Sequence, residues 1–387
     1  MLAALQLALD KRQADGLLRQ RRLLDSPQAE HIVTNDQSYL SFCSNDYLGL
    51  ANHPELISAM QQAAGESGVG SGASNLITGH HRYHDNLERQ LAAFVERPAA
   101  LLFSTGYMAN IGVLGALVGR GDVIFADKLN HACLNDGGYY SLASFHRFAH
   151  NDVQALEALL KTSTAQHKLI AVDAVFSMDG DIAPLAEYLQ LCERYDAYLY
   201  VDDAHGFGVL GEHGQGTLHH LGLRSPRIIM MATLGKAAGV AGAFVAAEAV
   251  VINYLIQTAK SYVYSTPAPP ALSATLSASL KLIAQGDALR AHLYGLIAYF
   301  KARLSCQKWR LMPSDTSVQP LIVGSNQAAL ALSAYLQKNG ILVPAIRPPT
   351  VPAGTARLRI SISAAHSLED IQKLLQAIHQ AESELPS

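Results

Sequence analysis

The feature that most constrains the fold is an alternation of short apolar runs with helical stretches, which begins near residue 99. Helical stretches are expected at residues 152–161 and 184–195, and Pro184 suits the first turn of the second stretch. The apolar runs occupy residues 100–103, 123–126, 169–175, 197–201, 228–232 and 243–246. Apolar strands that alternate with helices indicate βαβ units, because parallel strands need a long crossover connection. We therefore predict an α/β fold with a mostly parallel central sheet flanked by helices.

The chain beyond the proline-rich residues 267–270 has a different pattern, typical of a smaller C-terminal α+β domain. The expected order is long helical stretches between residue 271 and about residue 303, a strand at 318–323, a helix at 327–339, two short strands and a final helix near 368–381. Leu2, Leu5 and Leu9 share one helical face, so an amphipathic helix is expected over roughly the first 24 residues. The predicted division is an N-terminal segment (1–45), a large domain (46–280) and a small domain (281–387).

The composition argues against several classes of protein. Lys plus Arg number 29 and Asp plus Glu number 32, so the net charge is −3, and neither nucleic acid nor a membrane is an expected partner. No apolar run reaches the ~20 residues of a membrane-spanning helix, and Asp10, Lys11 and Arg12 interrupt any signal-peptide core. The cysteines are far apart, as expected for reduced thiols in a cytoplasmic protein, and they are Cys43, Cys133, Cys192 and Cys306.

Two strand ends carry side chains that suggest chemistry. The strand at 197–201 leads into Asp202, Asp203 and His205, at the edge of the sheet where ligands bind in open α/β folds. The alternative is a capping aspartate followed by a turn. Lys236 follows the strand at 228–232 and has small residues around it, which favours Schiff-base chemistry. The alternative is an ordinary solvated lysine.

Three further patterns are weaker. Gly106 lies where a strand passes into a helix, so backbone N–H groups there could bind a phosphate, although many such turns contain glycine. Residues 206–211 match G-x-G-x-x-G, but loop residues follow where a dinucleotide-binding site needs a helix. His80, His81 and His84 have no accompanying set of carboxylate residues, so a surface or interface loop is favoured over a zinc-binding site. His131 on its own would be interpreted as a buried structural histidine.

Together these motifs are in the chain order of fold-type-I pyridoxal-phosphate enzymes, which the sequence resembles. Within that group it is similar to the α-oxoamine synthases at residues 44–50, 70–72, 176–180 and 201–206. Residues 147–152 and 347–359 resemble the branch of this family that acts in biotin biosynthesis. The resemblance covers nearly the whole chain.

The resemblance implies pyridoxal 5'-phosphate as cofactor, bound covalently by Lys236 and paired through its ring nitrogen with Asp202. It places His131 against the ring, which makes Lys236, Asp202 and His131 the expected catalytic residues; no metal site is implied. The other implied cofactor contacts come from Gly106, Tyr107, Ser177, His205 and Thr233. The implied substrate contacts come from Arg19, Asn45, His131, Thr350 and Arg359. Ser265 and Thr266 are expected to reach the phosphate of a partner subunit in a homodimer.

The resemblance also implies a reaction. The expected substrates are L-alanine and a pimeloyl thioester, either pimeloyl-CoA or pimeloyl-acyl carrier protein, joined with loss of CO2. The nearest alternative is another α-oxoamine synthase, such as a glycine C-acetyltransferase, a 5-aminolevulinate synthase or a serine palmitoyltransferase subunit. An aminotransferase of the same fold is a different class, and it would release no CO2. A subunit without activity would be expected to lack Lys236 or Asp202, and both are present.

Overall fold

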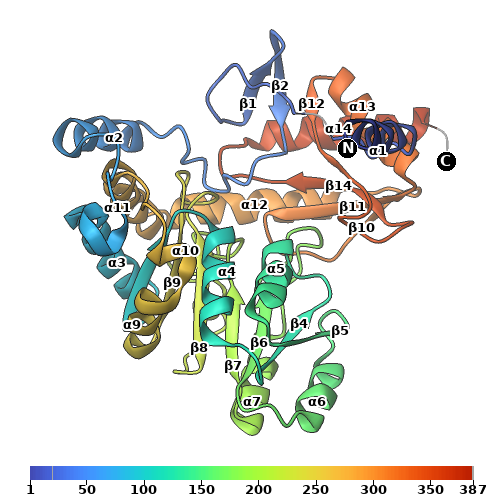
Figure 1. Ribbon diagram of the computed structural model, residues 1–387. Coiled ribbons are helices and arrows are strands. Elements are labelled where there is room, and N and C mark those ends of the chain that lie inside the picture. The colour runs from blue at the N-terminus through green and yellow to red at the C-terminus, as the bar shows by residue number, and fades with distance from the viewer. Residues whose placement is uncertain (20, 386–387) are drawn as a thin grey trace. The chain divides into compact units, whose positions relative to one another are not determined.

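The structure, a computed structural model, describes residues 1–19 and 21–385 (Figure 1). The chain forms two compact units. The first unit contains Met1–Gly49, Met178–Asp181 and Ala291–Ser387, and the second contains Leu50–Ser177 and Ile182–Arg290. The three-domain division expected from the sequence stays a prediction.

A seven-stranded sheet is the centre of the second unit, with the strand order β3-β9-β8-β7-β6-β4-β5. The strands are β3 (Ala99–Phe103), β4 (Val123–Asp127), β5 (Ser144–Phe148), β6 (Lys168–Asp173), β7 (Tyr198–Asp202), β8 (Ile228–Thr233) and β9 (Ala243–Ala247). Strands β8, β7, β6, β4 and β5 pair in parallel, whereas β9 is antiparallel to both of its neighbours. The predicted α/β fold with a mostly parallel sheet is therefore confirmed.

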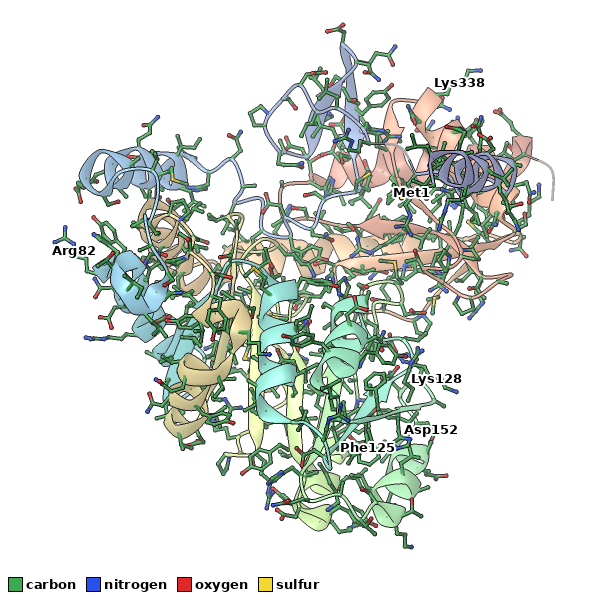
Figure 2. The ribbon with its side chains drawn as sticks, in the orientation of Figure 1. Met1, Arg82, Phe125, Lys128, Asp152 and Lys338 are labelled. Atoms are coloured by element: carbon green, nitrogen blue, oxygen red, sulfur yellow. The ribbon has the colours of Figure 1, made fainter. Side chains whose placement is uncertain are left out.

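The second unit contains ten α-helices in its described residues. They are α2 (Pro54–Ser67), α3 (Arg82–Phe94), α4 (Gly106–Leu117), α5 (Ala132–Ser141), α6 (Val153–Thr162), α7 (Leu185–Tyr195), α8 (Thr217–His220), α9 (Ala249–Thr258), α10 (Lys260–Val263) and α11 (Pro270–Ala284), with a π-helical turn η1 (Asn75–Gly79). Of these, α3, α4, α5, α7 and α9 pack against strands of this sheet. Helices α4 and α5 lie side by side against the sheet (Figure 1). Leu114 of α4 and Leu134 of α5 pack into one apolar core with Ile124 and Tyr200. Phe125 of β4 is also fully interior, whereas Arg82 at the start of α3 is exposed (Figure 2).

The first unit contains two small sheets. One has the order β1-β2-β12, formed by β1 (His31–Thr34), β2 (Gln37–Ser41) and β12 (Ile341–Leu342). The other has the order β10-β11-β14-β13 and is antiparallel throughout, formed by β10 (Arg310–Leu311), β11 (Val318–Gly324), β14 (Ala356–Ser361) and β13 (Ala345–Ile346). Its helices are α1 (Leu2–Ala14), α13 (Asn326–Lys338) and α14 (Leu368–Glu384), and α12 (Asp287–Arg303) spans the residues at which the second unit ends and the first resumes.

One expectation about a single element was wrong, and one strand had not been expected. Helix α1 ends at Ala14 rather than near residue 24, because Gly16 takes a left-handed conformation (φ 65°) that closes the helix. The helical stretches expected between residues 271 and 303 are the two helices α11 and α12, separated at Gln285 and Gly286. Strand β5 had not been expected, because an edge strand with mostly exposed side chains has no apolar run.

The three neighbouring histidines have structural partners. His81 Nδ1 accepts a hydrogen bond from the Tyr83 amide, and His84 Nδ1 accepts one from the His81 amide, so together they cap α3. Across residues 1–19 and 21–385, no cluster of three or more His, Cys, Asp and Glu side chains could hold a metal ion. Over the same residues, none of the helices has the length and apolar character needed to cross a membrane.

Candidate active site

Three aspartates meet at the carboxyl edge of the large sheet. Asp127 ends β4, Asp173 ends β6 and Asp202 ends β7, and Asp173 lies directly opposite Asp202 in the strand pairing. Their exposed fractions are 0%, 5% and 4%. Because parallel strands end at a common edge, residues far apart in sequence converge here. Burial and the neighbouring Asp202 carboxylate raise the pKa of Asp173 well above its usual range.

The structure distinguishes Asp202 from Asp203, a choice that the sequence left open. Asp202 Oδ1 accepts from the Ala204 amide at 3.1 Å, and Oδ2 accepts from Asn110 Nδ2 at 2.7 Å. Asp203 binds Thr217 instead, accepting from its amide at 2.7 Å and from its hydroxyl at 2.5 Å. Burial raises the pKa of Asp203 to about 7. Asp203 therefore holds the start of α8, whereas Asp202 has no contact with that helix among these hydrogen bonds.

Lys236 and His205, both predicted from the sequence, lie together. Lys236 follows β8, and its Nζ is 2.8 Å from His205 Nε2. His205 is three residues beyond Asp202 in the same strand-to-turn segment and is buried. A contact of this length requires one nitrogen to accept the hydrogen bond, so the pair can pass a proton between an amine and an imidazole.

His131 begins α5, where its ring has a fixed direction. Its Nδ1 accepts from the Cys133 amide at 3.3 Å and lies 2.7 Å from Cys133 Sγ, and its own amide donates to Asp173 Oδ2 at 2.6 Å. Burial raises the pKa of the Cys133 thiol to about 12, so the sulfur keeps its proton and can donate it to Nδ1. Because Nδ1 is an acceptor, the neutral ring carries its proton on Nε2.

The start of α4 lies beside the end of β8. A side-chain carbon built on Gly106 would be 3.9 Å from the Cβ of Thr233. Thr105 caps the helix by accepting from the Met108 amide at 3.1 Å, while the first amides of any helix have no partner within it. The Tyr107 hydroxyl donates to Asp136 Oδ2 at 2.6 Å, so it is the backbone amide of Tyr107 that could bind an anion at this helix start. This arrangement can hold a phosphate.

A second group of predicted residues lies in the first unit. Arg359, on β14, is 5% exposed and donates to Ser361 Oγ at 2.9 Å and to the Tyr47 hydroxyl at 3.3 Å. That hydroxyl in turn donates to Asn45 Oδ1 at 3.1 Å. The predicted pair of Asn45 and Arg359 is therefore joined through Tyr47, which sequence reasoning had missed. A buried guanidinium in this setting is suited to a carboxylate.

An arginine-lined pocket of about 300 Å³ lies elsewhere in the first unit. Arg19 donates to Thr350 Oγ1 at 3.5 Å, and Arg347 donates to the Gly16 carbonyl. None of the described residues that line it is acidic, and they are Arg12, Leu17, Arg19, Ala345, Ile346, Arg347, Pro348, Pro349 and Thr350. The sequence had indicated Arg19 and Thr350 but not Arg12 or Arg347. Three guanidinium groups favour an anionic ligand.

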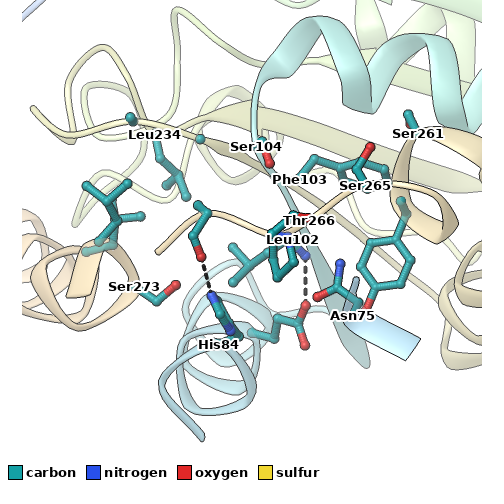
Figure 3. Close-up of a pocket in the computed structure, with 18 residues that line it drawn as sticks. Asn75, His84, Leu102, Phe103, Ser104, Leu234, Ser261, Ser265, Thr266 and Ser273 are labelled. Atoms are coloured by element: carbon teal, nitrogen blue, oxygen red, sulfur yellow. Dashed lines mark hydrogen bonds between the residues drawn. The ribbon is translucent and has the colours of Figure 1, made fainter. Parts of the chain in front are cut away.

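Ser265 and Thr266 line a different cavity of the second unit, with Asn75 and His84 (Figure 3). Its volume of about 30 Å³ holds water but no substrate. Ser177, the remaining predicted contact, is the last residue of the second unit before Met178–Asp181.

Glu88 lines the cavity of Figure 3 and gives a pH-dependent stability. Its Oε1 accepts from the Leu102 amide at 2.9 Å, Oε2 is 3.9 Å from His80 Nε2, and burial, reinforced by Asp85, raises its pKa to about 7. The folded state thus keeps a proton that the unfolded state releases above ~4.3, so stability falls as pH rises from about 4 to 7. We expect Glu88→Gln to remove this decline, a difference of up to about 3 kcal/mol at pH 8.

Unfolding in urea at pH 5 to 8 measures this effect, with Glu212→Gln, at an exposed position, as control. Parallel curves for the wild type and Glu88→Gln would contradict it.

The family comparison agrees with this fold. The model of the aminotransferase class I and II family matches residues 37–378, and the chain belongs to this family. Relatives named 8-amino-7-oxononanoate synthase include one from Methylobacillus flagellatus, 57% identical over 99% of this chain and 96% of the relative. Another, from Nitrosospira multiformis, is 56% identical over 96% of this chain and 93% of the relative.

Solved structures show the same likeness at lower identity. Serine palmitoyltransferase from Sphingomonas wittichii is 29% identical, with a TM-score of 0.94 over 100% of both chains. A serine palmitoyltransferase variant from S. paucimobilis, solved with a bound PLP–myriocin aldimine, has 27% identity and a TM-score of 0.92 over 98% of this chain and 96% of the other. An 8-amino-7-oxononanoate synthase from Francisella tularensis has 29% identity and a TM-score of 0.76 over 88% of this chain and 97% of the other.

Proposed function

We propose that this protein catalyses the condensation of L-alanine with a pimeloyl thioester to give 8-amino-7-oxononanoate, CO2 and a free thiol, a step of biotin biosynthesis. The observation that carries the proposal is the identity of more than half of the residues, over nearly the full chain, to relatives with that name. Lys236, Asp202 and His205 are all present at one sheet edge, so the residues that the reaction needs are intact.

The residues at the sheet edge fit pyridoxal 5'-phosphate. Asp202 offers a buried carboxylate to the ring nitrogen, Lys236 offers an amine to the aldehyde, and the first amides of α4 beside Thr233 form a cradle for the phosphate. His205 and Ser177 are assigned to the ring hydroxyl. When bound there, the cofactor withdraws electrons from the α carbon of an amino acid.

The protein's own residues then move protons and fix positions. Lys236 Nζ takes the proton from the α carbon of alanine and later returns one, and His205 Nε2 holds the amine in place between these steps. Asp202, held by Asn110 and Ala204, would face the ring nitrogen. His131 would lie against the ring and present Nε2–H to a substrate oxygen, because Nδ1 is already engaged by Cys133.

The first unit supplies the substrate contacts in this proposal. Arg359, steadied by Tyr47 and Asn45, binds the alanine carboxylate with a planar two-donor fork. Arg19 and Thr350 bind the acyl donor, and the surrounding arginine-lined pocket suits a carboxylate or phosphate of that donor. Pimeloyl-CoA and pimeloyl-acyl carrier protein both carry such groups.

A homodimer in the cytoplasm is part of the proposal. Val69, Ile77 and Tyr264 are 84%, 75% and 80% exposed, and apolar side chains this exposed are suited to a subunit interface. Ser265 and Thr266 follow Tyr264 in sequence, which suits their assignment to the partner's phosphate.

Pairing each amino acid with each acyl donor, and measuring thiol release, tests the choice of substrates. We expect L-alanine with pimeloyl-CoA to give the highest kcat/KM. Glycine should be weaker by about 10- to 200-fold, because one methyl group in a pocket is worth only ~1–3 kcal/mol. Highest efficiency with glycine and acetyl-CoA would make the protein a glycine C-acetyltransferase instead.

A further inference from the structure

The side-chain amide of Asn110 lies directly behind Asp202. Asn110 is in the second turn of α4, and its Nδ2 donates to Asp202 Oδ2 at 2.7 Å and to Cys133 Sγ at 2.8 Å. Its Oδ1 accepts from the Tyr200 hydroxyl at 2.7 Å. Asn110 and Tyr200 both have an exposed fraction of 0%, so these bonds form out of reach of bulk water. The amide thus has a partner on each of its two ends.

Tyr200 determines which way this amide points. Burial and the nearby charge of Asp202 raise the pKa of Tyr200 well above its usual range, so the phenol keeps its proton and must donate. A donor facing Asn110 requires the amide oxygen on that side, which turns the N–H2 group toward Asp202. The reversed amide would place an oxygen against the carboxylate and leave the Tyr200 hydroxyl without an acceptor.

The neighbouring Asp173 makes this direction important. Asp173 and Asp202 are paired residues on adjacent strands, and burial together with the Asp202 carboxylate raises the pKa of Asp173 well above its usual range. Asp202 accepts hydrogen bonds from Asn110 Nδ2 and the Ala204 amide, whereas Asp173 accepts one from the amide of His131. The two donors on Asp202 therefore fix the direction of its carboxylate beside Asp173.

We propose that Asn110 and Tyr200 are positioning residues for Asp202: the Tyr200 hydroxyl orients the Asn110 amide, and the amide keeps the Asp202 carboxylate aimed at the cofactor's ring nitrogen. This inference rests on the proposed function, because that ring nitrogen belongs to the cofactor of that function. Asn110 and Tyr200 act through Asp202, and neither is assigned a contact with cofactor or substrate.

The affinity of the apoprotein for pyridoxal 5'-phosphate tests whether Tyr200 and Asn110 act together on Asp202. We compare the wild type, Asn110→Leu, Tyr200→Phe and the double variant by equilibrium dialysis against pyridoxal 5'-phosphate. Asn110→Leu should weaken the Kd by about 10- to 100-fold, since it removes a bond to a charged group, and Tyr200→Phe by about 3- to 10-fold. The double variant should match Asn110→Leu within about twofold, because Tyr200 acts only through Asn110. Tyr188→Phe, which removes a fully buried hydroxyl from α7, is the control and should stay near the wild-type Kd.

Two further readouts separate positioning from loss of structure. The thermal midpoint of each apoprotein reports folding, and Asn110→Ser replaces Asn110→Leu if the latter does not fold. In the holoenzyme, kcat should fall with Asn110→Leu while KM for L-alanine changes less than about threefold. Losses of cofactor affinity that add up in the double variant would overturn the proposed positioning of Asp202 by Asn110 and Tyr200. Unchanged Kd and kcat in the single variants would overturn it as well. A wild-type protein that binds no pyridoxal 5'-phosphate would instead overturn the proposed function.

Discussion

Replacing Lys236 with alanine is expected to reduce turnover by roughly 10³-fold or more, because one amine both binds the cofactor covalently and moves the α-carbon proton. The folded protein should remain, since Lys236 lies in a loop after β8 and is only partly buried. Its Nζ is 2.8 Å from His205 Nε2, and alanine has no amine that could make this contact. Steady-state kinetics and the melting temperature of the variant measure the two effects separately.

Lys281→Ala, at an exposed position of α11, is the matched control and should keep wild-type activity. Borohydride reduction of the wild-type holoenzyme should fix the cofactor onto Lys236, as peptide mapping would show. A labelled peptide that contains a different lysine would contradict this assignment, and so would substantial turnover by Lys236→Ala.

Replacing Asp202 with asparagine is expected to cost several kcal/mol of barrier, roughly 10²- to 10³-fold in kcat at 1.36 kcal/mol per tenfold. The amide fills the same space, so the cofactor should still bind, but it carries no charge to keep the ring nitrogen protonated. The structure sharpens this expectation, because Asp202 is held by Asn110 and Ala204 whereas Asp203 is occupied by Thr217.

Asp203→Asn is therefore the matched control for Asp202→Asn. It should lower thermal stability, because a buried hydrogen-bonded pair with Thr217 is disturbed, while kcat stays within about threefold of the wild type. The opposite result, a large loss of kcat in Asp203→Asn with little in Asp202→Asn, would exchange the roles of the two aspartates.

The sequence predicted the large sheet well because its strands are short, buried and apolar on both faces. The runs ending near Ala126, Val201 and Ala232 correspond to β4, β7 and β8 within two residues. Strand β5 had no such signal, because it is an exposed edge strand. Helix α1 was overextended because apolar spacing cannot show a left-handed glycine such as Gly16, which ends it.

Site residues could be predicted where they lie in a local sequence motif. They could not be predicted where the fold brings together residues that are far apart in the sequence. Asp202, His205 and Lys236 each follow an apolar strand, so their place at the sheet edge could be inferred. The contact of Asn110 with Asp202 joins residues 92 positions apart, and that of Arg359 with Tyr47 joins residues 312 apart. Local patterns hold no information on such contacts, and the resemblance named only one residue of each pair.

L-Alanine labelled with ¹³C at its carboxyl group tests whether the condensation releases this carbon as CO2. With pimeloyl-CoA as acyl donor, we expect one labelled CO2 for each thiol released, and no labelled CO2 when either substrate is omitted. Labelled pyruvate formed from the alanine with a keto-acid acceptor, without release of CO2 or thiol, would contradict the account and make the protein an aminotransferase.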